Sequence, residues 1–367
     1  MKPLLLAFAV FATIPCANAD KGPIWTMKLP VRQRSLLAPY ARLAAQERTT
    51  RRKERREYSS YLDRAIQDAP ATLTLLNGHP ERRAPNAAFS FPFYNSGSAM
   101  KEIAETDFGF CLGFTYLLRK FNVLATFRPD LPRLARVEEY FGRIDAIAED
   151  FPDEIPGYAD LYTFASDPRI ARHLKLHIAD EWAKRNVSRA GLHVYAEGFG
   201  ALKSREIDRL LADLRRVLAL GVNPIVYFAI DPNAKPALFA EIADRICAVD
   251  PNSCAAVKET LAKQAKADWL GKIVERTGMI HVVQVYDLRM DADGKAHLLV
   301  WDINERAEIA STDLVVDPNR ETASYPLSAD LGAIGRVSVP ANVKAVALHP
   351  DEHAEIGRML YNLSHSR

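Results

Sequence analysis

The spacing of apolar residues divides the chain into a mainly helical first part and a strand-rich last part. Apolar residues recur at helical intervals over residues 31–68, 111–121 and 204–220, and most of residues 130–230 has the same character. The segment between 77 and 100 is rich in Pro, Gly, Asn and Ser and is expected to form loops. Further helices are predicted over residues 236–248, 255–275 and 351–363.

The β-prone segments come late in the chain. A short apolar run at residues 224–230 predicts a buried strand. Strands are expected at 281–288 and 296–301, because Asp291-Ala292-Asp293-Gly294 between them is a strong hairpin turn. Two more β-prone pieces lie at 312–316 and 343–348. Helices that precede strands, rather than alternating with them, favour an α+β fold.

The first 19 residues have the three parts of a secretory signal peptide. Lys2 supplies a basic start, an apolar run follows from Leu4 to Ile14, and Ala17-Asn18-Ala19 offers a cleavage site. The apolar run is shorter than the roughly 20 residues that cross a bilayer. We therefore expect export to the periplasm or the outside of the cell, without a transmembrane segment once the signal is removed.

Charge is balanced over the whole chain but not along it. The 48 basic and 46 acidic side chains nearly cancel, which argues against nucleic acid as a partner. Residues 20–66 contain the basic run Arg48–Arg56 and are expected to form a helical arm, or a propeptide cut at Arg51-Arg52. Residues 67–367 would then form the main domain.

The cysteines indicate one disulfide and one single thiol. Cys16 leaves with the signal peptide, and Cys247 and Cys254 flank the turn-prone segment Asp250-Pro251-Asn252-Ser253. An oxidising compartment favours a Cys247–Cys254 disulfide, with two isolated thiols as the alternative. Cys111 then has no partner, and it is either a buried small hydrophobe or a nucleophile.

Cys111 lies where a loop becomes a helix, between Gly109 and Gly113. Unpaired amides at a helix start favour a thiolate, and the two glycines would let a substrate backbone approach. His281 opens a strand and is the natural base for such a thiol. A four-residue hairpin loop would place Met290 opposite Lys295, His281 opposite Asn304 and Asp302 opposite Val283, so that Asp302 and Asn304 share the face of His281. A loop of odd length would break this arrangement.

These segments resemble the papain-like cysteine peptidases, including the bacterial leader-processing branch. The matching text is Gly109-Phe110-Cys111-Leu112-Gly113-Phe114, His281-Val282-Val283-Gln284-Val285-Tyr286 and Leu299-Val300-Trp301-Asp302-Ile303-Asn304. The resemblance implies a two-lobed fold, with the Cys helix in a helical lobe and the His and Asp in a β-rich lobe. It also implies that Cys111 is the nucleophile, His281 the base and acid, and Asp302 the orienting group, with Asn304 as the alternative.

The chain departs from that family at the oxyanion region. The family carries Gln six positions before the cysteine, and this position is Glu105. An ionised carboxylate would repel the oxyanion, so Glu105 would have to be protonated or displaced, with Asn95 or Thr106 as a substitute donor.

The resulting prediction is an exported cysteine hydrolase that acts on a peptide or protein substrate by acyl-enzyme chemistry, without metal or cofactor. The alternatives are a non-catalytic binding protein of the same fold and a transglutaminase-like acyltransferase. Two His pairs at helical spacing, His173 with His177 near Asp180 and His349 with His353, lack the adjacent Glu of metalloproteases. They are interpreted as surface histidines, with a metal site on the two pairs as a minor alternative.

Overall fold

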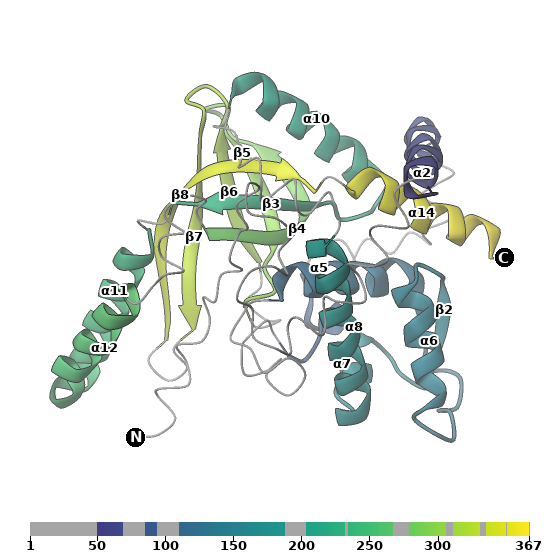
Figure 1. The fold of residues 1–367 in the computed structure, drawn as a ribbon, viewed down its shortest axis with the longest axis horizontal. Helices are drawn as coiled ribbons and strands as arrows, with labels where there is room; N and C mark the ends of the chain where they lie inside the picture. Colours follow the sequence, from purple (N-terminus) through teal and green to yellow (C-terminus); the bar gives the residue numbers. More distant parts are fainter. Residues whose placement is uncertain are drawn as a thin grey trace.

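A helical region packs against a closed barrel of β-strands, as Figure 1 shows for the computed structural model of the chain. The predicted signal peptide and the first part of the basic arm lie outside the described residues. The structure describes residues 50–68, 85–93, 110–187, 203–231, 234–266, 279–305, 311–330, 335–349 and 351–366.

The helical region is built around α5, which carries Cys111 at its first position. The strands β1 and β2 of this region form a small parallel sheet. The elements are α2 (Thr50–Gln67), the 3-10 turn η5 (Ala87–Phe89), α5 (Cys111–Leu124), β1 (Ala125–Arg128), α6 (Glu139–Ala148), β2 (Asp153–Pro156), α7 (Leu161–Ala165), α8 (Pro168–Val187) and α14 (Glu352–His365).

Six antiparallel strands form the barrel, in the order β3-β4-β5-β6-β7-β8, and β8 pairs with β3 to close it. The helices α10 and α11 pack against its strands, and α12 lies beside α11 (Figure 1). The elements are α10 (Ser204–Ala219), β3 (Ile225–Ile230), α11 (Ala234–Val249), η6 (Pro251–Ser253), α12 (Cys254–Lys266), β4 (Met279–Met290), β5 (Ala296–Trp301), β6 (Ser311–Asp317), β7 (Thr322–Asp330) and β8 (Arg336–Leu348).

The strand β3 is buried on both faces, which explains its continuous apolar sequence. Val226 and Phe228 belong to the core shared by the barrel with α10 and α11. Ile225 and Tyr227 point the other way and join the core of the helical region. One strand therefore connects the two cores, and the barrel and helices are packed as one body.

The predicted papain-like two-lobed arrangement is wrong. His281 and Asp302 belong to a closed six-stranded antiparallel barrel, and the Cys111 helix packs directly on its strand β4. The motifs that suggested the papain-like fold specify a hairpin and a helix start. Both features fit many architectures, whereas closure of the barrel depends on the distant pairing of β3 with β8.

The second half of the basic arm is part of the folded body. Helix α2 packs along α14, and its Leu62 is completely buried. The two backbones approach most closely at Gly357, where an added Cβ would lie 2.0 Å from the carbonyl oxygen of Tyr58. Arg55 forms an ion pair with Asp351. Residues 50–66 thus cover α14 rather than extending from the domain.

Most predicted elements are present, but three strands were not foreseen. The strand β2 lies within residues 130–230, which were expected to be mainly helical, and β1 lies just before them. The strand β7 was not predicted, and it contains Pro326, a residue that is unfavourable inside a sheet. In the structure Pro326 lies opposite Pro340 of β8, so the two residues that cannot donate a backbone hydrogen bond face each other.

The predicted disulfide between Cys247 and Cys254 is confirmed. It joins the end of α11 to the start of α12 across the turn at η6, where the Asp250 side chain accepts from the Asn252 amide. Among the described residues no helix is long and apolar enough to cross a membrane.

Candidate active site

Cys111 is the first residue of α5 and the free cysteine of the described part of the chain. Phe110 precedes it without a side-chain cap, and the first helical hydrogen bond runs from the Phe114 amide to the Phe110 carbonyl. The backbone amides of the first helical turn, which begins at Cys111, therefore have no acceptor within the helix. Cys111 is 7% exposed, compared with 1% for Phe110.

Gly113 fixes α5 against α8. A Cβ at this position would lie 2.0 Å from the carbonyl oxygen of Ile178 and 3.0 Å from the amide nitrogen of Trp182. The glycine is therefore required by the close approach of the two helices. The prediction that Gly113 makes room for a substrate backbone is wrong, because the α8 backbone occupies that side.

Two buried hydrogen bonds connect α5 to the strand that carries His281. The Gln284 side chain donates to the carbonyl of Thr115 at 2.8 Å, and the Thr115 hydroxyl donates to the carbonyl of Val282 at 3.4 Å. Thr115 lies one turn after Cys111, and Val282 follows His281. The helix start and the histidine are thus held in a fixed relation.

His281 points inward at one end of the barrel. It pairs across the ladder with Phe228 of β3, whose ring lies 5.5 Å from the imidazole. Asp302 follows the last residue of β5, and its carboxylate accepts from His281 Nε2 at 2.9 Å. Antiparallel pairing places the start of β4 and the end of β5 at the same end of the barrel.

The register that brings these residues together differs from the predicted one near the turn. The loop covers five residues, 291–295, so Met290 pairs with Ala296 rather than with Lys295. An odd loop would move Asp302 to the other face, but a β-bulge at Tyr286 inserts one extra residue and restores the pairing of Val285 with Val300. The bulge therefore compensates for the loop before the strands reach His281.

Asp302 is held by three donors. Besides His281, the Tyr325 hydroxyl donates to its second oxygen, and the Asn304 backbone amide donates to Oδ1 at 2.8 Å. Asp302 thus occupies the orienting position at the imidazole. The Asn304 side-chain nitrogen lies 3.4 Å from Nδ1 and 3.3 Å from Nε2 of His281, within hydrogen-bond reach of both.

The electrostatics of the cluster favour a charged imidazole. Burial alone would lower the pKa of His281, but the charge and hydrogen bond of Asp302, together with a hydrogen bond and charge from Cys111, raise it to about 10. Burial would raise the pKa of Asp302, yet the charge of His281 and the hydrogen bonds it receives lower it below its ordinary value. Burial and the Asp302 charge raise the pKa of Tyr325 well above 10. At neutral pH the cluster therefore holds an imidazolium, a carboxylate and a neutral phenol.

Because Asp302 engages Nε2 of His281, the thiol would have to use Nδ1, which the Asn304 side chain approaches at 3.4 Å. A hydrogen bond and charge from Cys111 are among the causes that raise the pKa of His281, so the thiol lies near the ring. The structure therefore brings Cys111, His281 and Asp302 together, as a nucleophile, a base and an orienting group would need. Glu105, Asn95 and Thr106 lie outside the described residues.

Sequence reasoning missed Tyr325 and Gln284. Tyr325 lies on β7, the strand that was not predicted, and its inward position follows the alternation of Ala323, Tyr325 and Leu327. Gln284 was visible as a polar residue within an otherwise apolar strand. A fully buried glutamine requires hydrogen-bonding partners, and this signal was available in the sequence.

Two buried cations fix α5 at its far end. Arg119 pairs with Glu352 of α14, whose carboxylate also accepts from the Ile225 amide at 2.7 Å. Lys120 pairs with Asp150 at 3.1 Å and Glu181 at 3.0 Å. A cavity of about 280 Å³ beside this network is lined by charged residues of α2, α8 and α14 and contains no residue of the Cys111 cluster.

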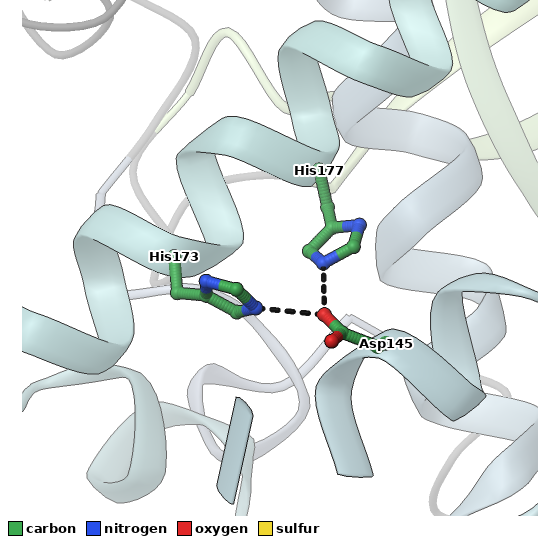
Figure 2. Close-up of side chains that lie close together, drawn as sticks. All are labelled: Asp145, His173 and His177. Carbon is green, nitrogen blue, oxygen red and sulfur yellow. Dashed lines mark hydrogen bonds and ion pairs between the residues drawn. The ribbon is translucent and has the colours of Figure 1, made fainter. Parts of the chain in front are cut away.

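The two histidine pairs differ in whether their members share a helix face. His349 follows β8 and is buried against Tyr116 and Tyr227, while His353 lies in α14, so this pair does not share a helix face. His173 and His177 do share a face of α8. Both rings meet Asp145 of α6 rather than Asp180 (Figure 2).

Neither a protein-family model, nor a curated protein, nor a solved structure matches the chain. The resemblance to papain-like peptidases therefore stays a prediction about the chemistry of three residues.

Proposed function

We propose that the chain is an exported cysteine hydrolase that cleaves a peptide or related amide bond. The observation that carries this proposal is the buried hydrogen bond from His281 Nε2 to Asp302, on a strand that hydrogen bonds hold against the helix beginning at Cys111. A single thiol, an imidazole and a buried carboxylate in this order form the basis of nucleophilic thiol catalysis.

The first half-reaction forms a thioester. The reactive form of the pair in this proposal carries the proton on His281 and the negative charge on the Cys111 sulfur. The thiolate attacks the scissile carbonyl carbon, and the carbon–oxygen double bond becomes an oxyanion. When this intermediate collapses, the carbon–nitrogen bond breaks, and His281 gives its proton to the departing amine.

The second half-reaction returns the enzyme to its starting state. Neutral His281 takes a proton from water, and the resulting hydroxide attacks the thioester carbonyl. The carbon–sulfur bond breaks, the acid product leaves, and Cys111 becomes a thiolate beside the imidazolium. Asp302 keeps the ring oriented throughout, and the hydroxyl of Tyr325 helps to hold Asp302 as a carboxylate.

Amides in the first turn of α5 are the proposed donors to the oxyanion. They precede the first intrahelical hydrogen bond and lie beside the sulfur. Glu105, the residue expected in this region from the sequence, would oppose the developing charge. Replacing it in Glu105→Gln is expected to speed acylation, and an unchanged rate would remove Glu105 from the oxyanion region.

Export is proposed from residues 1–19 and is supported by the disulfide. A Cys247–Cys254 bond forms and persists in an oxidising compartment such as the periplasm or the extracellular space. A peptide or protein outside the cytoplasm is accordingly the proposed substrate class.

The test is to detect the acyl-enzyme. The processed protein is mixed with a short peptide library and, separately, with an activated ester, and the Cys111 peptide is examined by mass spectrometry after rapid quenching. The proposal expects a burst of product and an acyl mass on Cys111, both absent in Cys111→Ala.

Two other outcomes would each favour one of the alternative functions. An acyl adduct that is transferred to an added primary amine, without hydrolysis, would replace the hydrolase with an acyltransferase. No adduct and no burst with any substrate, in a protein that retains the wild-type melting temperature, would favour a non-catalytic binding protein.

A further inference from the structure

Three potential metal ligands meet on the surface formed by α6 and α8, away from the Cys111 cluster. His173 and His177 lie one turn apart on α8, and Asp145 extends from α6. Figure 2 shows both rings directing Nε2 at the same carboxylate oxygen of Asp145. The two nitrogen–oxygen distances are 2.8 Å and 2.7 Å.

The donor set is one that zinc prefers. Two imidazole nitrogens and one carboxylate oxygen lie within 4.8 Å of one another, and His with Asp is a common ligand combination for Zn²⁺. Tetrahedral ligands at about 2.0–2.1 Å from zinc are roughly 3.3 Å apart. The two nitrogen–oxygen separations would therefore have to open by only about half an ångström, which small side-chain rotations provide.

The surroundings hold the ligands in place and leave room for water. The ring of Phe141 stacks on His173 with centroids 4.3 Å apart and an interplanar angle of 13°. The side chains of His173 and His177 are 20% and 18% exposed, whereas that of Asp145 is 51% exposed. A cation bound between the three groups would face solvent on the carboxylate side, where water can complete its coordination.

The cation Lys184, on the same helix, is paired with carboxylates of α8. Lys184 is engaged with Asp180 at 2.7 Å and with Glu181 at 3.6 Å. Asp180 is therefore occupied by Lys184, which explains why the third ligand comes from α6.

We propose that Asp145, His173 and His177 form a site for a divalent transition-metal ion of the zinc type, bridging α6 and α8. The cation takes the place between the rings and the carboxylate where two hydrogen bonds now lie. Because α8 is the helix on which α5 packs at Gly113, a bound cation strengthens the support of the Cys111 helix without entering the chemistry. The site stands independently of the hydrolase proposal.

The experiment is a calorimetric zinc titration of the processed chain, purified without a histidine tag and carrying Cys111→Ser so that the thiol does not bind the metal. One equivalent of saturable zinc binding is expected, with a rise in melting temperature that a chelator reverses. His177→Gln keeps a donor for Asp145 but replaces the ligand nitrogen. It should keep the zinc-free melting temperature and lose both the binding and the rise.

His297→Ala is the matched control, since His297 also lies between two carboxylates, Asp291 at 3.2 Å and Asp313 at 3.4 Å, on the barrel. It should bind zinc as the Cys111→Ser parent does. The proposal is overturned if the parent shows no saturable binding, or if His177→Gln and His173→Gln bind as tightly as the parent.

Discussion

The contact of α5 with α8 predicts that the same substitution will have opposite effects at two helical glycines. In Gly113→Ala the new Cβ would lie 2.0 Å from the carbonyl oxygen of Ile178. Both atoms belong to helix backbones, so the helices would have to separate by about 1 Å or more to reach an ordinary contact. In Gly142→Ala, on α6, no atom lies within 4 Å of the added Cβ.

The two effects differ in sign because the clash is present in one variant only. Overpacking of a core costs about 1–3 kcal/mol or more, and a rigid backbone neighbour places Gly113→Ala at the upper end. The higher helix propensity of Ala compared with Gly stabilises the folded state of both variants by roughly 1 kcal/mol. The free energy of unfolding should therefore fall by about 2 kcal/mol in Gly113→Ala and rise by up to about 1 kcal/mol in Gly142→Ala.

Urea unfolding followed by circular dichroism measures both changes, with the midpoint shifting at constant slope. Alkylation of Cys111 should also slow in Gly113→Ala, because its helix start moves relative to His281. The reasoning about helix docking fails if the two variants shift the free energy of unfolding in the same direction.

Three further predictions concern the cluster and the disulfide. Tyr325→Phe removes a donor to buried Asp302 and should lower the free energy of unfolding by about 1.5–3 kcal/mol; an unchanged urea midpoint would contradict that hydrogen bond. The pKa of His281 is about 10 when folded and about 6.5 when unfolded, so its stabilisation is complete below pH 6.5 and is lost as pH rises through 10. Urea midpoints across this range should fall for wild type more steeply than for His281→Gln, and parallel curves would refute the assignment. Replacing both Cys247 and Cys254 by Ser should cost up to about 2.5 kcal/mol, given the short loop they close, and a reductant should lower the midpoint of wild type but not of that variant.

Local patterns were sufficient to predict the elements that carry Cys111, His281 and Asp302. The apolar stripe at 204–220 gave α10 (Ser204–Ala219), and the hairpin signal at residues 291–294 gave β4 and β5. Cys111 was expected at a helix start, and it is the first residue of α5. These features depend on interactions between residues close in sequence, which a periodic pattern records.

The parts that could not be predicted depend on distant contacts. No local sequence pattern at Tyr286 predicts a β-bulge, yet the bulge determines which side chains share the face of His281. The closure of the barrel requires β7, which was not predicted and which pairs with both β6 and β8. Asp145 lies 28 residues before His173 and was not predicted as its partner. Asp180 has the right spacing on the same helix, but it is paired with Lys184.

The account depends most on the charge state of the Cys111–His281 pair. The decisive measurement is the rate at which iodoacetamide labels the Cys111 peptide between pH 6 and pH 8, in wild type and in His281→Gln. An imidazolium–thiolate pair predicts rapid labelling of wild type already at pH 6, with little gain at higher pH. The variant should label at least about tenfold more slowly at pH 6 and gain with pH, as an ordinary thiol does. Wild-type labelling that is slow at pH 6 and rises in parallel with the variant would contradict the proposed chemistry.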